Sequence, residues 1–283
     1  MTEIGPVARL RFNQIRVVSK TLETLSSHQG IGKVLGSLGR NPLVGHTLVG
    51  FRRSFMSFEE AQRCASRYHV PSHEHPGNIT NHLSLAESPR TSDYPVLFHL
   101  QHLLHEIRSV LDIGGSAGNL FYCYGRYLPY PDDLSWTVFE VPQNVSRGRQ
   151  LAQQRGERKL HFIDHLSGLS NADTVIISGS LHYFDALPPD LMRYLKRPPK
   201  HVFINRTPVI DGPSKVTIQD AGAYYAMSPA RILSRKTLLE SMAGANYELV
   251  DEWKIPDLRL KIPLDPGSSA STYSGFYFRS LPA

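Results

Sequence analysis

Short apolar runs alternate with amphipathic stretches along the chain from about residue 90. Apolar runs of four to six residues between polar or glycine residues are typical of buried strands, and apolar residues at a spacing of three and four are typical of helices. The strands expected from this pattern are residues 110–113, 136–141, 159–163, 174–178 and 201–205. The helices expected with them are residues 94–107, 119–127, a helix ending at 155, 188–195 and 234–244.

Two further strands, residues 247–253 and 271–278, follow without a helix between them. They should therefore pair antiparallel at one edge of the sheet. Strands that alternate with helices favour a parallel sheet covered on both faces. The predicted fold class is thus α/β, with a Rossmann-like sheet of seven strands that is parallel except for the terminal edge pair.

The first 90 residues follow a different pattern. Apolar residues between 10 and 25 are spaced as on a helix face, and Ser57 with Glu60 forms a capping box that should open a helix through Arg67. Residues 69–90 are rich in histidine and proline and have no periodicity, so we expect a loop or lid there. We therefore predict a mostly helical N-terminal cap, residues 1–90, and a main domain, residues 91–283.

The charge and the cysteine content exclude some kinds of protein and of binding site. The chain has 31 basic and 25 acidic residues, a net charge of +6, and the first 53 residues carry eight basic against two acidic residues. That segment either docks its apolar side on the core or lies on anionic lipid. Cys64 and Cys123 are the only cysteines, which excludes a disulfide scaffold and a four-cysteine zinc site. No apolar run reaches the roughly 18 residues of a membrane span, and we expect a cytoplasmic protein.

A glycine-rich turn follows the first strand of the main domain, from Asp112 to Asn119. The dinucleotide pattern G-x-G-x-x-G does not fit it, because placing its last two glycines on Gly115 and Gly118 leaves Ile113 at the first. Asp112 lies at the strand end, where it would repel a pyrophosphate. An acid facing the turn suits a ligand that carries an ammonium group near its ribose, such as S-adenosylmethionine.

These residues resemble the first motif of class I S-adenosylmethionine-dependent methyltransferases, D-x-G-x-G-x-G. Asp112, Gly114 and Gly118 match it, and Ser116 stands in place of the middle glycine. The resemblance implies that S-adenosylmethionine is the cofactor, that Glu140 binds the ribose hydroxyls, and that Asp164 contacts the adenine amino group. The full set of cofactor-binding residues implied is Asp112, Gly114, Gly115, Ser116, Gly118, Glu140, Asp164 and Ser178.

The chain also resembles, more closely, a family of bacterial methyltransferases associated with surface-polysaccharide genes. The motifs that carry this resemblance are Gly50-Phe51, Phe58 to Ala61, Arg90 with Tyr94-Pro95, Asp112 to Gly115, Trp136 to Glu140, Ser178 to Tyr183, and Asn205 to Pro208. It implies O-methylation of a small molecule or a glycan. That family often has glutamine where this chain has His182.

The methyl acceptor should lie beyond the end of the fourth strand. His182 follows that strand, and a neutral imidazole can take the proton of an acceptor hydroxyl, so we predict it as the general base. The residues predicted to bind the acceptor are Tyr183, Arg206, Tyr224 and Tyr225. Arg206 could pair with a carboxylate or phosphate of the acceptor.

Other interpretations of the sequence remain open. A nicotinamide-dependent oxidoreductase on a related fold and a cofactor-binding scaffold without catalysis are alternatives. The basic charge suggests a nucleic-acid binder, but no nucleic-acid module is present and we predict none. His73-Glu74-His75 lacks a metal-binding motif, and we predict no metal. Contact of the basic N-terminus with a membrane, and homo-oligomerisation, are left open.

Overall fold

The computed structural model describes residue 21 and residues 50–66, 86, 88–168, 171–220, 227–262 and 265–282. The chain divides into a larger unit, Pro76–Thr207, Arg235–Leu258 and Tyr273–Ala283, and a smaller unit, Met1–His75, Pro208–Ser234 and Arg259–Thr272. The helix predicted near residues 10–25 lies outside the described residues except for residue 21, and so does the loop predicted at 69–90 except for residues 86 and 88–90. The division into residues 1–90 and 91–283 therefore stays a prediction.

The larger unit is built on seven strands in the order β4-β3-β2-β5-β6-β10-β9. Neighbouring strands from β4 to β6 pair parallel, whereas β10 pairs antiparallel with β9. This confirms the predicted Rossmann-like α/β sheet with an antiparallel edge pair. The strands are β2 Ser109–Ile113, β3 Ser135–Phe139, β4 Leu160–Ile163, β5 Thr174–Ser178, β6 His201–Ile210, β9 Tyr247–Ile255 and β10 Tyr273–Ser280.

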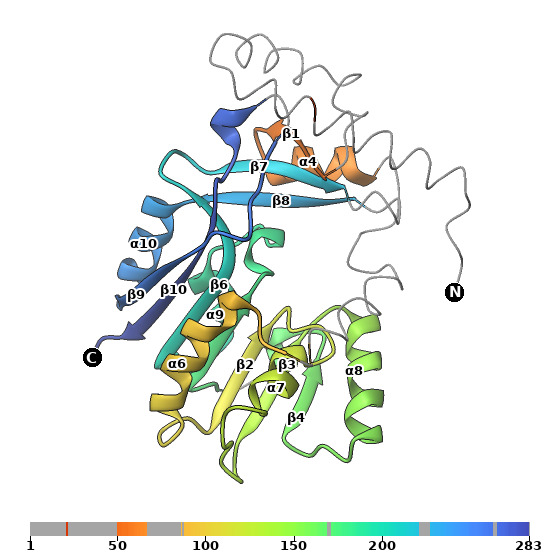
Figure 1. Ribbon diagram of the computed structural model, residues 1–283, viewed down its shortest axis with the longest axis vertical. Helices are drawn as coiled ribbons and strands as arrows, with labels where there is room; N and C mark the ends of the chain where they lie inside the picture. The colour runs from red at the N-terminus through yellow and green to blue at the C-terminus, as the bar shows by residue number, and fades with distance from the viewer. Residues whose placement is uncertain are drawn as a thin grey trace. The chain divides into compact units, whose positions relative to one another are not determined.

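Five helices accompany this sheet in the described chain: α6 Tyr94–Leu103, α7 Asn119–Tyr124, α8 Pro142–Gln154, α9 Pro188–Met192 and α10 Arg235–Gly244. Figure 1 shows α8 beside the edge strand β4 and α10 beside the opposite edge strand β9. Helices α6, α7 and α9 end a few residues before their predicted ends. After α7, the Gly125 N–H still donates to the Phe121 carbonyl, and the chain continues in turns over residues 125–127.

One hydrophobic core holds α6 and α7 against the sheet. It brings Leu100 of α6 and Tyr124 of α7 together with Trp136 of β3 and Phe203 of β6. All four side chains are at most 2% exposed, and burying an apolar side chain of this size stabilises a fold by about 1.5–3 kcal/mol. The core therefore fixes where the carboxyl ends of these strands lie.

The smaller unit contains strands that the sequence pattern did not predict. Strand β7, Lys215–Asp220, pairs antiparallel with both β1, Gly50–Phe55, and β8, Met227–Ser234. Helix α4, Phe58–Ser66, packs on β7 and β8. The connection expected between the fifth strand and the last helix is thus partly a hairpin of strands.

The capping box predicted for α4 is confirmed in outline. The Glu60 N–H donates to Ser57 Oγ at 3.1 Å, and the Glu60 carboxylate accepts the Met56 N–H at 3.1 Å. The carboxylate therefore reaches back one residue further than in the usual box, where it accepts the N–H of the capping residue itself.

Candidate functional site

The glycine turn joins β2 to α7 through three left-handed residues. Gly114, Ser116 and Gly118 have φ of 76°, 55° and 86°. A Cβ on Gly114 would collide with Ser180, and a Cβ on Gly115 would collide with the carboxyl group of Asp112. Glycine at these two positions therefore lets the turn lie directly on its neighbours. Ser116, where the resembled motif has glycine, carries a conformation that costs an L-residue about 1–2 kcal/mol.

Asp112 is buried beneath this turn, at 1% exposure. Neither of its carboxyl oxygens has a hydrogen-bond partner among the described residues. Burial, with a smaller contribution from Glu140, raises the pKa of Asp112 to about 7; the nearby Trp136 indole and Arg90 act in the opposite direction. A buried carboxyl group with unused acceptor oxygens is stabilised when a hydrogen-bond donor or a cation binds to it.

Glu140 follows β3 and faces the same turn. Its Oε1 accepts the Ser116 N–H at 3.2 Å, and its Oε2 accepts the Val141 N–H at 2.7 Å. Burial raises its pKa in spite of these bonds and a further one from Asn144. A carboxylate has about four acceptor positions, so these three donors leave room for one further hydroxyl group.

Asp164 and His165, after β4, are exposed and bound to each other. Asp164 Oδ1 lies 2.6 Å from His165 Nδ1, and this bond lowers the pKa of the aspartate. In the described part of the chain, the Asp164 side chain forms a hydrogen bond with His165. Among the described residues it forms none with the glycine turn or with Glu140. The structure therefore does not bring it into the group that the other acids form.

The segment after β5 is locked to the glycine turn. Ser180 Oγ donates to the Ile113 carbonyl at 2.5 Å, and the Gly179 N–H donates to the Asn205 carbonyl at 2.9 Å. A 3₁₀ turn, η5 Leu181–Tyr183, then carries His182. His182 is 3% exposed, and its ring centroid lies 4.0 Å from that of Tyr183 and 6.0 Å from that of Tyr273.

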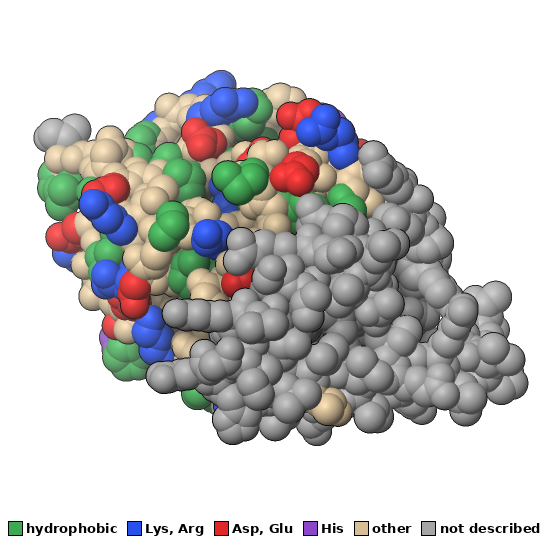
Figure 2. Space-filling view, turned by 90° about the horizontal axis from the view of Figure 1, so that it is seen from above, with side chains coloured by type: hydrophobic (Ala, Val, Ile, Leu, Met, Phe, Trp, Pro, Cys, Tyr) green, Lys and Arg blue, Asp and Glu red, His purple; other side chains and the backbone are tan. Residues whose placement is uncertain are grey.

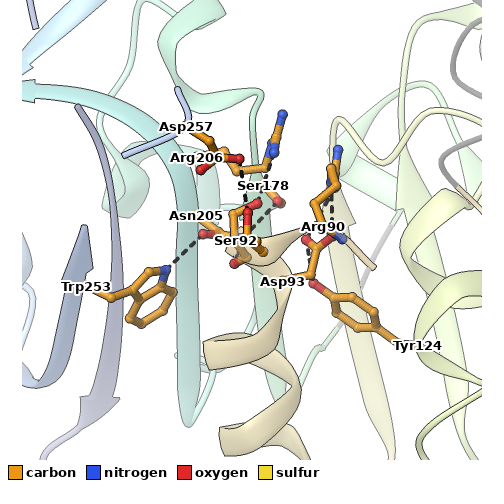
Figure 3. Close-up of polar contacts among 10 residues, drawn as sticks. Arg90, Ser92, Asp93, Tyr124, Ser178, Asn205, Arg206, Trp253 and Asp257 are labelled. Carbon is orange, nitrogen blue, oxygen red and sulfur yellow. Dashed lines mark hydrogen bonds and ion pairs between the residues drawn. The ribbon is translucent and has the colours of Figure 1, made fainter. Parts of the chain in front are cut away.

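A second polar network ties the start of α6 to the ends of β5 and β6 (Figure 3). Asn205 is completely buried and donates to the Ser92 carbonyl at 2.9 Å and, more weakly, to Ser178 Oγ at 3.4 Å. Its Oδ1 accepts the Trp253 indole N–H at 3.1 Å. Every polar atom of this amide side chain is thus used to hold three separate segments together.

Near Asn205, two arginines form hydrogen bonds with the segment that contains Ser92 and Asp93. Arg90 binds Asp93 through its backbone N–H and its guanidinium, and the Tyr124 hydroxyl donates to the same aspartate. Arg206 Nη1 donates to Ser92 Oγ at 2.9 Å. Figure 3 shows both guanidinium groups on the same side of this segment.

The structure thus gathers most of the residues predicted for the site. The ends of β2, β3, β5 and β6 carry Asp112, Gly114, Gly115, Ser116, Gly118, Glu140, Ser178, His182, Tyr183 and Arg206. Tyr224 and Tyr225 lie outside the described residues. The roles of all these residues remain predictions.

Sequence reasoning missed the residues that hold the site in place, Ser92, Asp93, Asn205 and Trp253. Arg90 and Asn205 occurred only as letters of the resembled motifs. No periodicity marks a buried amide whose partners are 27, 48 and 113 residues away along the chain.

The raised pKa of Asp112 leads to a testable dependence of stability on pH. Because the folded state binds this proton more tightly than the unfolded state, the free energy of unfolding should fall as pH rises from about 4 to about 7. The shift from 3.8 to about 7 corresponds to about 4 kcal/mol at most. Asp112→Asn should remove this contribution and be the more stable protein at pH 8. Urea unfolding of both proteins at pH 5 and pH 8 measures this contribution. The same difference in free energy of unfolding between the two proteins at both pH values would contradict the prediction.

Charges on the visible described surface are mixed. Figure 2 shows basic and acidic side chains interspersed among apolar and uncharged ones on one face, with no large area of either sign. Within the described ranges, no three histidine, cysteine or acidic side chains are grouped as metal ligands. Among the helices described, none has the length and apolar composition needed to cross a bilayer.

No protein-family model matches the sequence, and no curated protein matches it. Solved structures similar to it include the Burkholderia thailandensis 1,6-didemethyltoxoflavin-N1-methyltransferase with bound 1,6-didemethyltoxoflavin and S-adenosylhomocysteine. That match has 19% identity and a TM-score of 0.46, and covers 82% of this chain and 94% of the other. The N-terminal domain of EvdMO1 with S-adenosylhomocysteine bound matches at 14% identity and a TM-score of 0.46, over 80% of this chain and 98% of the other.

Magnesium protoporphyrin IX methyltransferase from Synechocystis PCC 6803, with S-adenosylhomocysteine bound, matches at 13% identity and a TM-score of 0.46. That match covers 68% of this chain and 82% of the other. Values this low say nothing about the ligands of this chain. The fold assignment depends on the strand order described above.

Proposed function

We propose that this protein is an S-adenosylmethionine-dependent methyltransferase that methylates a hydroxyl group of a small molecule or glycan. The observation that carries the proposal is the pair of acids at the ends of the adjacent strands β2 and β3. Asp112 lies beneath the glycine turn and Glu140 accepts a backbone N–H from within it, in a sheet with the strand order of class I methyltransferases. The resemblance to a surface-polysaccharide family favours a sugar among the acceptors.

The residues fit this cofactor chemically. The unused oxygens of Asp112 suit a cationic group, and the remaining acceptor position of Glu140 suits a ribose hydroxyl. Gly114 and Gly115 keep the turn free of side chains, so that its backbone can approach a ligand. Asp164, exposed at the end of β4, is proposed to contact the adenine amino group, and Ser178 to contact the methionine portion.

Bound S-adenosylmethionine would supply the methyl group from its sulfonium. The chain's own part is to orient the acceptor oxygen and to remove its proton. We assign proton removal to His182, which follows β5, and orientation to Tyr183 and Arg206, with Tyr224 and Tyr225 from the segment outside the described residues. The acceptor hydroxyl would give its proton to the His182 imidazole as its oxygen takes the methyl group, and the neutral thioether left behind would need no further acid.

Calorimetric titration with S-adenosylmethionine tests this proposal. Glu140→Gln keeps the shape of the side chain but loses its charge, and we expect affinity to fall about ten- to a hundredfold, the equivalent of about 1.5–3 kcal/mol. Glu157→Gln is the matched control, because that residue lies beyond the far end of α8 and accepts only the Lys159 N–H in the described structure. The affinity of the Glu157→Gln protein for S-adenosylmethionine should equal that of the parent protein.

The same titration separates the alternatives. Binding of NAD but not of S-adenosylmethionine would favour an oxidoreductase. Binding of S-adenosylmethionine with no effect of Glu140→Gln would overturn the site. If the cofactor binds as expected, release of S-adenosylhomocysteine in the presence of hydroxylated acceptors distinguishes an enzyme from a scaffold that only binds.

A further inference from the structure

Arg206 has a backbone conformation that a long side chain rarely adopts. Its φ is 56°, although it lies within strand β6. A left-handed residue of this kind costs about 1–2 kcal/mol, and such residues are concentrated at functional sites. The conformation turns the Arg206 side chain across the end of β5, where an added Cβ on Gly179 would lie 3.5 Å from Arg206 Nε.

The guanidinium group has few partners in the described chain. One of its five N–H groups donates to Ser92 Oγ, a neutral hydroxyl, at 2.9 Å, and among the described residues it forms no ion pair. Burial lowers the pKa of Arg206, and the neighbouring charge of Arg90 adds to this effect. The guanidinium therefore lies half-buried with most of its donors unused (Figure 3).

The acids nearby are already engaged. Asp93 is bound by Arg90 and by the Tyr124 hydroxyl, and Asp257 accepts the Thr91 hydroxyl at 3.0 Å. Both raise the pKa of Arg206 from a distance, as Tyr273 does, without direct hydrogen bonds to it. The positive charge of Arg206 thus has no carboxylate of its own in the described structure.

We propose that Arg206 binds a carboxylate of the methyl acceptor, so that the enzyme selects acidic acceptors. This rests on the proposed function. Along the sheet, Glu140 follows β3 and the glycine turn follows β2, whereas Ser178 lies in β5 and Arg206 in β6. Neighbouring strands are about 4.8 Å apart, so Arg206 lies two strands beyond the glycine turn, on the side away from the ribose-binding acid. A planar carboxylate matches the two parallel N–H groups of a guanidinium.

Matched acceptor pairs test this selectivity. S-adenosylhomocysteine release is measured with 4-hydroxybenzoate and 4-hydroxybenzamide, and with glucuronate and glucuronamide; for any pair without turnover, binding of both members to the S-adenosylhomocysteine-loaded protein is measured instead. We expect the acid of a pair to be preferred by the parent protein. Arg206→Gln should weaken use or binding of the acid about ten- to a hundredfold and leave the amide unchanged. Ser92→Ala, which keeps the charge but removes its one hydrogen bond, should give a smaller loss.

The control is Arg193→Gln, because Arg193 is an exposed arginine that also binds a hydroxyl, that of Tyr194. It should leave the acid preference unchanged. Equal treatment of acids and amides by the parent protein, or binding of neither, would overturn the proposal. So would a loss of affinity in Arg206→Gln for S-adenosylhomocysteine but not for 5′-methylthioadenosine, because Arg206 would then hold the cofactor's own carboxylate. Failure of the parent protein to bind S-adenosylmethionine would instead contradict the proposed function.

Discussion

His182→Ala should lower the single-turnover rate of methyl transfer about 10²- to 10⁴-fold, the range that a general base contributes. His182 follows β5 on the 3₁₀ turn that Ser180 anchors to the end of β2. Affinity for S-adenosylmethionine should change little, because the imidazole is assigned to the acceptor and not to the cofactor. The loss should shrink as pH rises, since an acceptor that ionises unaided no longer needs the base.

Because the His182 ring is buried against Tyr183 and Tyr273, its removal also deletes packing. His182→Gln separates the two effects, since glutamine fills space and forms hydrogen bonds but cannot accept the proton. If His182 is the general base, both variants should be slow. If it only packs against the two tyrosines, His182→Gln should restore the rate. His161→Ala, on the exposed side of β4, is the control. Normal rates for both His182 variants would assign proton removal elsewhere, with His165 and Tyr225 as the next residues to replace.

Asn205→Leu should lower the free energy of unfolding by about 2–4 kcal/mol, because leucine has nearly the same volume but none of the polar atoms. The change leaves the buried Ser92 carbonyl and the half-buried Trp253 indole N–H without their partner, and a buried polar group that loses its partner costs about 1–3 kcal/mol. Denaturant unfolding measures it. Arg206, the next residue, should also lose its position, so acid-acceptor use should fall as well.

A matched variant serves as the control for the Asn205→Leu prediction. Asn171→Leu replaces an asparagine whose only described bond is a 3.4 Å contact from Arg197 at the surface, and it should change stability by no more than about 0.5 kcal/mol. An Asn205→Leu protein as stable as the parent would show that the three segments are held by packing alone.

The parts of the fold that the sequence predicts are those with a local signal. Val175, Ile176 and Ile177 are completely buried, as expected of a parallel strand covered on both faces, and β5 has its predicted bounds. The turn from Asp112 to Gly118 was recognisable because glycine spacing reflects backbone conformation directly.

The strands of the smaller unit were missed for reasons that their residues make clear. Val216 and Ile218 alternate with polar residues and are buried, so β7 did carry a two-residue period. Its partner β8 contains Pro229, which argues against a strand within a sheet, although here Pro229 pairs in register with Ile218. A hairpin between a parallel strand and a helix also departs from the simple alternation on which the prediction depended.

The left-handed conformation of Arg206 and the convergence on Asn205 had no local signal at all. Each is decided by partners that are distant in sequence, Ser92 and Trp253 among them. Such features become visible only when the segments are placed in space.

Strand β10 is the last of the seven in the chain, yet it lies inside the sheet, between β6 and β9. During synthesis, β6 and β9 therefore emerge before the strand that joins them, and their inward-facing edges stay unpaired until residues 273–280 leave the ribosome. Unpaired edges of this kind are sites of intermolecular strand addition. A protein shortened before Tyr273 would lack the strand that joins β6 to β9, and we expect it to be prone to aggregate.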